Sequence, residues 1–90
     1  MRKGRLPKSL FSPTYERFLA VLRKARIDSG HTQVDVAESL GRPQSFVSKC
    51  ESGERRVDVA EFLAFCEAIE ADPHGIIDTL VQPKTRGKRT

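Results

Sequence analysis

Two amphipathic helix patterns follow one another in this chain with almost no spacer, and that spacing restricts the possible folds more than any other feature. The first pattern opens at Thr32, which forms a capping-box arrangement with Asp35, and it ends at Gly41. The second opens at Pro43 and ends at Gly53. A connection this short makes the two helices cross steeply instead of lying antiparallel. The sequence therefore predicts a helix-turn-helix.

One helix is expected before this pair and two are expected after it. Ser12 suits the N-cap of the first helix, with Pro13 at its first position. Asp58 and Glu61 form a second capping box, which precedes an apolar stripe at helical spacing. The residues expected on this core-facing stripe are Val59, Phe62, Leu63, Cys66 and Ile69, with Phe65 beside them.

The last expected helix opens at Asp72 and Pro73 and is rich in apolar residues. It holds more apolar side chains than one short helix needs to cover a core, so some of them are expected to form a two-fold interface. The residues expected at this dimer interface are Ile76, Leu80 and Val81. No segment shows the alternating pattern of a β-strand. We therefore expect an all-α chain, a five-helix bundle that contains a helix-turn-helix.

The helix that begins at Pro43 has a polar outer face that packing alone does not explain. Its outward residues are Gln44, Ser45, Ser48 and Lys49. In the major groove of DNA, Gln can bond adenine through two hydrogen bonds, Lys suits guanine, and Ser can donate or accept. These four residues are therefore the candidates for reading bases. Phe46 beside them has two open interpretations, either packing or contact with a thymine methyl group or a sugar.

Positive charge is concentrated at the two ends of the chain. Residues 1–14 and residues 83–90 each contain four basic side chains and no acidic one, which leaves eight basic and twelve acidic side chains between them. We expect a flexible basic N-terminal arm over residues 1–11 and a flexible basic C-terminal tail over residues 83–90, flanking a domain at residues 12–82. These segments either keep the chain in solution or add sequence-independent attraction to a polyanion.

Enzymatic, metal-binding and membrane functions find no support in the sequence. Cys50 and Cys66 fall on inward helix positions, where cysteine acts as a small hydrophobic residue. Together with the two histidines they lack the spacing of a zinc site. No glycine-rich phosphate loop is present, and no apolar run approaches the roughly 20 residues of a membrane helix. We expect a cytoplasmic protein with no cofactor, no bound metal and no catalytic activity.

Three short motifs in the central part of the chain have a known counterpart. They read Thr32-Gln33-x-Asp35-Val36-Ala37, then Leu40-Gly41, then Val47-x-x-Cys50-Glu51-x-Gly53. This order resembles the Cro/Xre-type helix-turn-helix family of phage-repressor-like DNA-binding proteins, whose usual pattern is T-Q-x-[ED]-L-A, L-G and I-x-x-[ILW]-E-x-G. The similarity covers most of the chain, and it implies a lambda-repressor-like fold.

The resemblance also implies roles for residues in and around the two central helices. Gln33 would bond a DNA phosphate and brace the helix that reads bases, while Ser48 would lie between base and backbone. The residues expected to contact DNA phosphates are Gln33, Arg42, Arg55 and Arg56. Arg26 and Glu51 match a pair that forms a largely buried salt bridge in many family members.

Taken together, these features predict a transcriptional regulator that binds double-stranded DNA, acts as a repressor and forms a homodimer. Two alternatives stay open. The bundle could instead be a protein-interaction or antitoxin-like module that binds a partner through its last helix. It could also be a nonspecific nucleic-acid binder that acts through its basic ends. A protein regulator is a further partner that the sequence allows, and any other inducer would have to act through the dimer interface.

Overall fold

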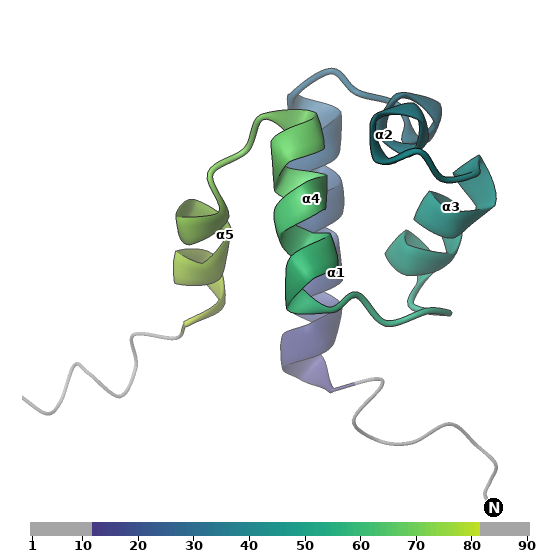
Figure 1. The fold of residues 1–90 in the computed structure, drawn as a ribbon. Coiled ribbons are helices and arrows are strands. Elements are labelled where there is room, and N and C mark those ends of the chain that lie inside the picture. The colour runs from purple at the N-terminus through teal and green to yellow at the C-terminus, as the bar shows by residue number, and fades with distance from the viewer. Residues whose placement is uncertain (1–11, 82–90) are drawn as a thin grey trace, which may run out of the picture.

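The computed structural model describes residues 12–81, which form five α-helices and no strand (Figure 1). The helices are α1 (Pro13–Asp28), α2 (Gln33–Leu40), α3 (Gln44–Ser52), α4 (Val59–Ile69) and α5 (Pro73–Leu80). The predicted all-α, five-helix architecture is therefore confirmed. The segments expected to be a flexible arm and tail, residues 1–11 and 83–90, lie outside the described residues. No helix in the described part of the chain has the length and apolar character needed to cross a bilayer.

Side-chain hydrogen bonds set the starts of four helices at the predicted positions, whereas α3 starts one residue after Pro43 and has no side-chain cap. The Ser12 hydroxyl accepts a backbone N–H from the first turn of α1 at 3.1 Å. At α2, the Asp35 backbone N–H donates to the Thr32 hydroxyl at 3.0 Å, and the Thr32 backbone N–H donates to the Asp35 carboxylate at 2.9 Å. Asp58 and Glu61 form the equivalent box at α4. Each box satisfies two backbone donors that a helix end would otherwise leave unpaired.

The core lies where α1 and α4, at the centre of the bundle, pack against the helices that flank them on two sides (Figure 1). In this view α2 and α3 lie on one side of α1 and α4, and α5 lies on the other. Phe18 of α1 meets Phe62 of α4 edge-on, with ring centroids 5.4 Å apart. Cys50 and Cys66 are free thiols in the core, and burial raises the pKa of both. The buried core residues are Leu22, Val36, Ala37, Phe46, Val47, Cys50, Phe62, Phe65, Cys66, Ile69 and Ile76.

The buried face of α4 differs from the predicted stripe. Val59 is 75% exposed and Leu63 is 49% exposed, whereas Phe65 is 2% exposed. Successive residues of an α-helix turn by about 100°, so Leu63 and Phe65 project on different sides of Phe62. The core lies on the side of Phe65 because this ring stacks on Phe46 of α3, with centroids 6.4 Å apart. Leu63 therefore turns to solvent.

The prediction that Ile76 lies at a dimer interface is wrong. Its side chain is 6% exposed and belongs to the core, while the neighbouring Ile77 is 44% exposed. The reason is that α5 packs on both α1 and α4, and this contact covers the side of α5 that carries Ile76. This part of the chain does expose large apolar side chains, as expected, but they are Ile77 and Val81, which directly follows α5 and is 64% exposed.

Removing the α4 capping box should destabilise the domain without changing its fold. In Asp58→Ala, the Glu61 backbone N–H loses its acceptor at 2.7 Å, and we expect the free energy of unfolding to fall by about 1 kcal/mol. Urea denaturation followed by circular dichroism measures this loss. Glu38→Ala, an exposed change within α2, is the control and is expected to stay within about 0.5 kcal/mol. An equal loss in both variants would contradict a stabilising role for the box.

Candidate nucleic-acid interface

A three-residue turn joins α2 to α3 and sets the angle between them. Gly41 ends α2 with φ +68°, a left-handed conformation that L side chains rarely adopt. The Arg42 backbone N–H donates to the Ala37 carbonyl at 3.0 Å, and Pro43 precedes α3 in an extended conformation. The predicted helix-turn-helix is therefore present.

This turn gives α3 one buried side and one exposed side. Phe46, Val47 and Cys50 are all at most 6% exposed. The opposite side brings together the four residues predicted to read bases, all of them exposed: Gln44, Ser45, Ser48 and Lys49. Because the major groove of duplex DNA is wide enough to admit a helix, these side chains could meet base edges there. We call α3 the recognition helix from here on.

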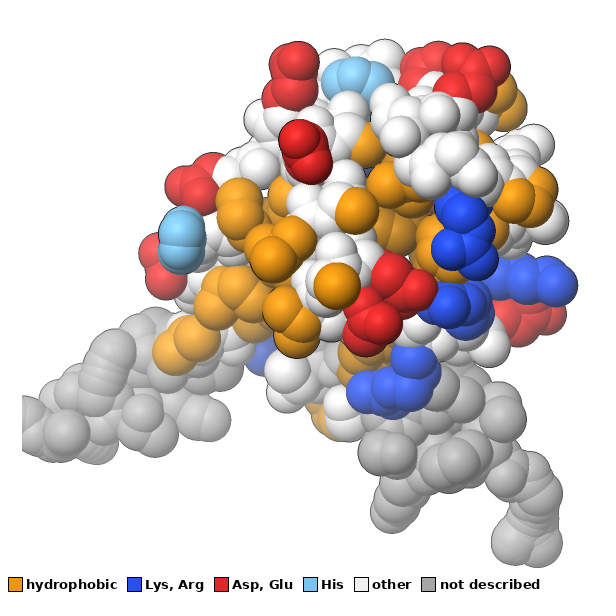
Figure 2. Space-filling model, in the orientation of Figure 1, with side chains coloured by type: hydrophobic (Ala, Val, Ile, Leu, Met, Phe, Trp, Pro, Cys, Tyr) orange, Lys and Arg blue, Asp and Glu red, His pale blue; other side chains and the backbone are white. Residues whose placement is uncertain are grey.

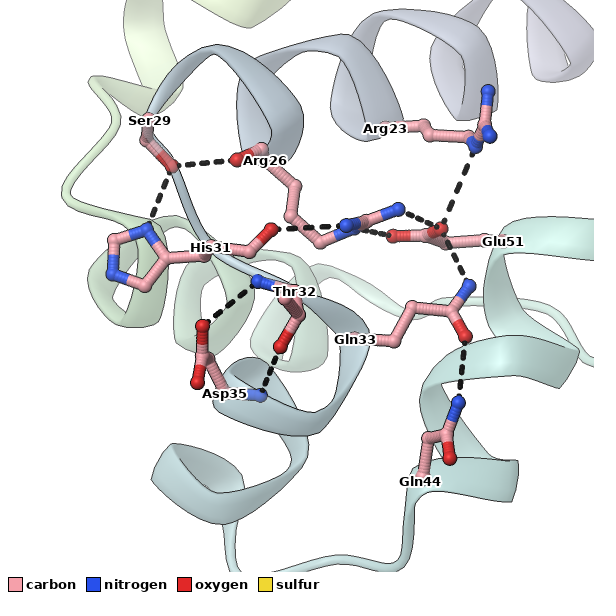
Figure 3. A network of polar contacts seen from close by, with 9 residues as sticks. All are labelled: Arg23, Arg26, Ser29, His31, Thr32, Gln33, Asp35, Gln44 and Glu51. Carbon is pink, nitrogen blue, oxygen red and sulfur yellow. Dashed lines mark hydrogen bonds and ion pairs between the residues drawn. The ribbon is translucent and has the colours of Figure 1, made fainter.

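A buried ion pair ties the recognition helix to α1 (Figure 3). Arg26 Nε lies 2.6 Å from Glu51 Oε2, and Arg26 Nη2 donates to Glu51 Oε1 at 3.0 Å. The two side chains are 10% and 5% exposed. Arg26 Nη1 also donates to the His31 backbone carbonyl at 2.9 Å. The pairing expected for Arg26 and Glu51 is thus observed, and it keeps either group from being an unpaired buried charge, which would be costly.

The same carboxylate begins a series of hydrogen bonds that reaches the outer side of the recognition helix (Figure 3). Gln33 Nε2 donates to Glu51 Oε1 at 3.0 Å, and Gln33 Oε1 accepts from Gln44 Nε2 at 3.2 Å. Since a carboxylate only accepts, Glu51 determines which end of the Gln33 amide faces it, and Gln33 then orients Gln44. Gln33 therefore braces the recognition helix as expected. Within this network Gln44 retains its oxygen and one N–H for other partners.

Phe46 lies beneath two of the arginines that were expected to contact phosphates. Its ring is 6% exposed and stacks on Phe65. The guanidinium carbons of Arg42 and Arg55 lie 4.0 Å and 4.8 Å from its centroid. Of the two interpretations of Phe46, packing is the one observed. Contact of Phe46 with a thymine methyl group or a sugar is a wrong prediction, because the ring turns toward α4 and not toward the exposed side of the recognition helix.

Arg55 has an acidic partner that the sequence analysis did not identify. Its guanidinium makes two contacts of 2.9 Å with the Glu61 carboxylate, and it donates to the Arg56 carbonyl at 2.8 Å. The hydrogen bond from Arg55, followed by that from the Asp58 backbone N–H, holds the pKa of Glu61 below its usual value. The sequence does contain a signal for this pair, since Arg55 precedes the capping box by only a few residues, but the capping pattern by itself predicts only a cap for Glu61.

Arg56 lies over a second aromatic ring. Its guanidinium carbon is 4.4 Å from the centroid of Tyr15, and the Tyr15 hydroxyl accepts the Val57 backbone N–H at 3.0 Å. Figure 2 shows that Lys and Arg side chains gather over the recognition helix and the loop that follows it. The exposed polar side of the recognition helix is thus bordered by basic side chains, a distribution suited to a polyanion.

Comparison with known proteins agrees with this geometry. A family model described as a helix-turn-helix domain matches residues 17–76. The chain is 49% identical to an XRE-family like protein from Pseudomonas syringae pv. tomato str. DC3000, with a TM-score of 0.72 over 74% of this chain and 82% of that one. No match is found among curated proteins.

Two restriction-modification controller proteins share the fold. The controller protein C.AhdI from Aeromonas hydrophila is 26% identical, with a TM-score of 0.64 over 72% of this chain and 98% of that one. The controller protein C.Esp1396I, solved as a tetramer in complex with its natural 35 base-pair operator, is 20% identical. Its TM-score is 0.70 over 78% of this chain and 92% of that one.

These matches and the geometry define the class of protein. The chain belongs to the helix-turn-helix family of the XRE type, a class of DNA-binding transcription regulators. The predicted Cro/Xre-type family is therefore confirmed. Members of this class act by binding DNA, so the residues of interest are those that can meet bases and phosphates.

Breaking the buried ion pair from one side should cost far more stability than breaking an exposed contact. In Glu51→Ala, Arg26 keeps its charge at 10% exposure without a carboxylate, and we expect the free energy of unfolding to fall by about 3–5 kcal/mol. Arg23→Ala is the control, because the Arg23 side chain is 60% exposed and 3.9 Å from the same carboxylate. It is expected to cost about 0–1 kcal/mol. Urea denaturation measures both changes.

A double variant separates the effect of charge from the effect of packing. Arg26→Met/Glu51→Leu leaves no unpaired charge, so we expect it to be more stable than Glu51→Ala. A double variant that is as unstable as Glu51→Ala would contradict this account, because the cost would then come from lost packing.

Proposed function

We propose that the chain reads specific DNA sequences by placing its recognition helix in the major groove, and that it represses transcription by occupying its operator. The observation that supports this most is the series of hydrogen bonds from Glu51 through Gln33 to Gln44. A side chain that is oriented before binding loses less conformational freedom when it binds. An exposed helix face that only had to remain soluble would not need such an arrangement.

Gln44 is proposed to recognise adenine. Its oxygen would accept a hydrogen bond from adenine N6, and its remaining N–H would donate to N7. Lys49 would favour guanine, while Ser45 and Ser48 would donate or accept according to the base they face. The residues proposed to contact phosphates, and so to set the register without specifying sequence, are Gln33, Arg42, Arg55 and Arg56.

Selection from a library of random duplexes at near-physiological salt tests sequence reading. We expect the chain to enrich a two-fold-symmetric motif with adenine in each half-site. Gln44→Ala/Lys49→Ala should lose or alter this motif, since each good base contact contributes about 1–3 kcal/mol of discrimination. Lys24→Ala is the control: it also removes a positive charge, but from a side chain of α1 that is 75% exposed and paired with Asp28, and it should keep the motif.

The outcomes of this selection separate the alternatives. A motif that is the same in the natural chain and in Gln44→Ala/Lys49→Ala would contradict base reading by the recognition helix. No motif, together with equal salt-dependent retention of both proteins, would favour a nonspecific binder that acts through charge. No retention of DNA by the natural chain would favour the protein-interaction module.

The proposal also calls for two copies of the chain, because one recognition helix contacts too few bases to select a site. Four apolar side chains on α4, on α5 and directly after α5, each between 44% and 75% exposed, are available for this contact. They are Val59, Leu63, Ile77 and Val81. Val59 and Ile77 line one groove with Leu80, and Arg56 also lines it. Residues 57–81, which supply the exposed apolar side chains of this face, contain no Lys or Arg, so they are suited to a protein partner. We propose that this apolar face forms the two-fold interface.

Ile77→Lys should separate the two copies. A lysine in the centre of an apolar interface would be desolvated without a partner, so we expect sedimentation equilibrium to show a monomer and two-site DNA binding to be lost. Ile27→Lys is the matched control, because Ile27 is 50% exposed and lies on α1 outside the apolar face. A dimer that survives Ile77→Lys would contradict the proposed interface, and a natural chain that is monomeric at all concentrations would contradict the homodimer.

A further inference from the structure

Three of the residues proposed to contact phosphates share a feature that their charge does not require, since each lies over an aromatic ring. The guanidinium carbon of Arg42 is 4.0 Å from the centroid of Phe46, and that of Arg55 is 4.8 Å from the same centroid. The guanidinium carbon of Arg56 is 4.4 Å from the centroid of Tyr15. Phe46 thus supports one arginine that precedes the recognition helix and one that follows it.

Both rings are held in place by the core. Phe46 stacks on Phe65, with 20° between the ring planes. Tyr15 is 8% exposed and packs against Phe18, with ring centroids 5.6 Å apart. Its hydroxyl accepts the Val57 backbone N–H, which joins α1 to the loop after the recognition helix. Neither ring can turn without disturbing its neighbours, so each gives a fixed support to the guanidinium above it.

A guanidinium that stacks on a fixed ring is oriented before DNA arrives. When a guanidinium lies flat on a ring, the N–H groups at its edge point away from the ring, where phosphate oxygens can accept them. Arg55 already donates to Glu61 and to the Arg56 carbonyl, so fewer of its N–H groups remain for a phosphate. Two guanidinium groups beside one ring repel each other. Glu61 offsets this repulsion through its two contacts with Arg55, and because these contacts lower its pKa, it stays ionised to a lower pH than an ordinary glutamate does.

We propose that Phe46 and Tyr15 are positioning residues for DNA binding, which hold Arg42, Arg55 and Arg56 in the orientation in which phosphate oxygens meet them. This inference rests on the proposed function. It adds two buried aromatic residues to an interface that otherwise consists of polar side chains. It also predicts that lysine would be a poorer residue than arginine at these three positions, because an ammonium group has no flat face to stack.

A thermodynamic cycle on Phe46 tests the inference. The Kd is measured by fluorescence anisotropy for the selected duplex, or for a random-sequence duplex at low salt if selection yields no motif. The temperature is one at which melting curves show every variant folded. We expect Phe46→Leu to weaken binding about fivefold in the natural chain. In an Arg42→Ala/Arg55→Ala chain the same change should leave the Kd unaltered, because no guanidinium remains to be positioned.

Phe62→Leu is the matched control for this cycle. It removes another core ring that is 6% exposed, as Phe46 is, but that ring meets Phe18 edge-on, whereas Arg42 and Arg55 lie over Phe46. We expect its effect on the Kd to stay within about twofold, in the natural chain and in the Arg42→Ala/Arg55→Ala chain alike.

Two further comparisons leave Phe46 intact. Arg42→Lys/Arg55→Lys keeps the net charge and is expected to weaken binding about threefold, whereas Arg17→Lys, on the α5 side of α1, is expected to have no effect. Tyr15→Phe keeps the ring under Arg56 and should bind more tightly than Tyr15→Leu, which removes it.

The results distinguish failure of the inference from failure of the proposed function. The positioning role is overturned, while DNA binding stands, if Phe46→Leu weakens binding by the same factor in the natural chain and in the Arg42→Ala/Arg55→Ala chain. It is also overturned if Phe46→Leu and Arg42→Lys/Arg55→Lys both bind as the natural chain does. If the natural chain binds neither duplex, the proposed function fails and the inference fails with it.

Discussion

The ion pair between Arg26 and Glu51 is the contact on which the geometry of the interface depends. It joins α1 to the recognition helix, and through the His31 carbonyl it also holds the segment that leads into α2. Both side chains are largely buried, so they must keep their relative positions, because moving one away would leave a buried charge unpaired. One carboxylate therefore sets the relative positions of three elements, and the crossing of α2 and α3 follows from it together with the turn at Gly41.

Contacts with the interior of the bundle orient side chains along both edges of the recognition helix. Along one edge, Gln33 bonds both the Glu51 carboxylate and the Gln44 amide, so the position of the carboxylate determines how Gln44 is oriented. Along the other edge, the stacking of Phe46 on Phe65 gives a fixed base to Arg42. A helix of nine residues thus presents polar and basic groups whose orientation comes from the interior, which favours preorganised recognition over a flexible charged surface.

The net charge of the chain does not show how positive and negative side chains are distributed over the bundle. The part of the chain between the basic ends has more acidic than basic side chains, yet residues 57–81 contain none of the basic ones. On the face shown in Figure 2, Lys and Arg side chains gather over the recognition helix and the loop after it, and α1 carries the other four basic residues of the described part of the chain. An acidic bundle can therefore present a positive side to a polyanion, while the exposed apolar side chains of α4 and α5 are suited to another protein surface.

The sequence by itself determined the helix starts, the short turn and the polar side of the recognition helix, because these depend on local hydrogen bonds and on helical period. The pairing of Arg26 with Glu51 followed from the family resemblance. The tertiary structure alone decided that Phe65 is buried and Leu63 exposed, and that Ile76 faces the core while Ile77 faces solvent. A helical period defines an apolar arc but not its centre, which depends on the neighbouring helices. The placement of Phe46 under two guanidinium groups has the same origin, because its partners come from segments that only the folded chain brings together.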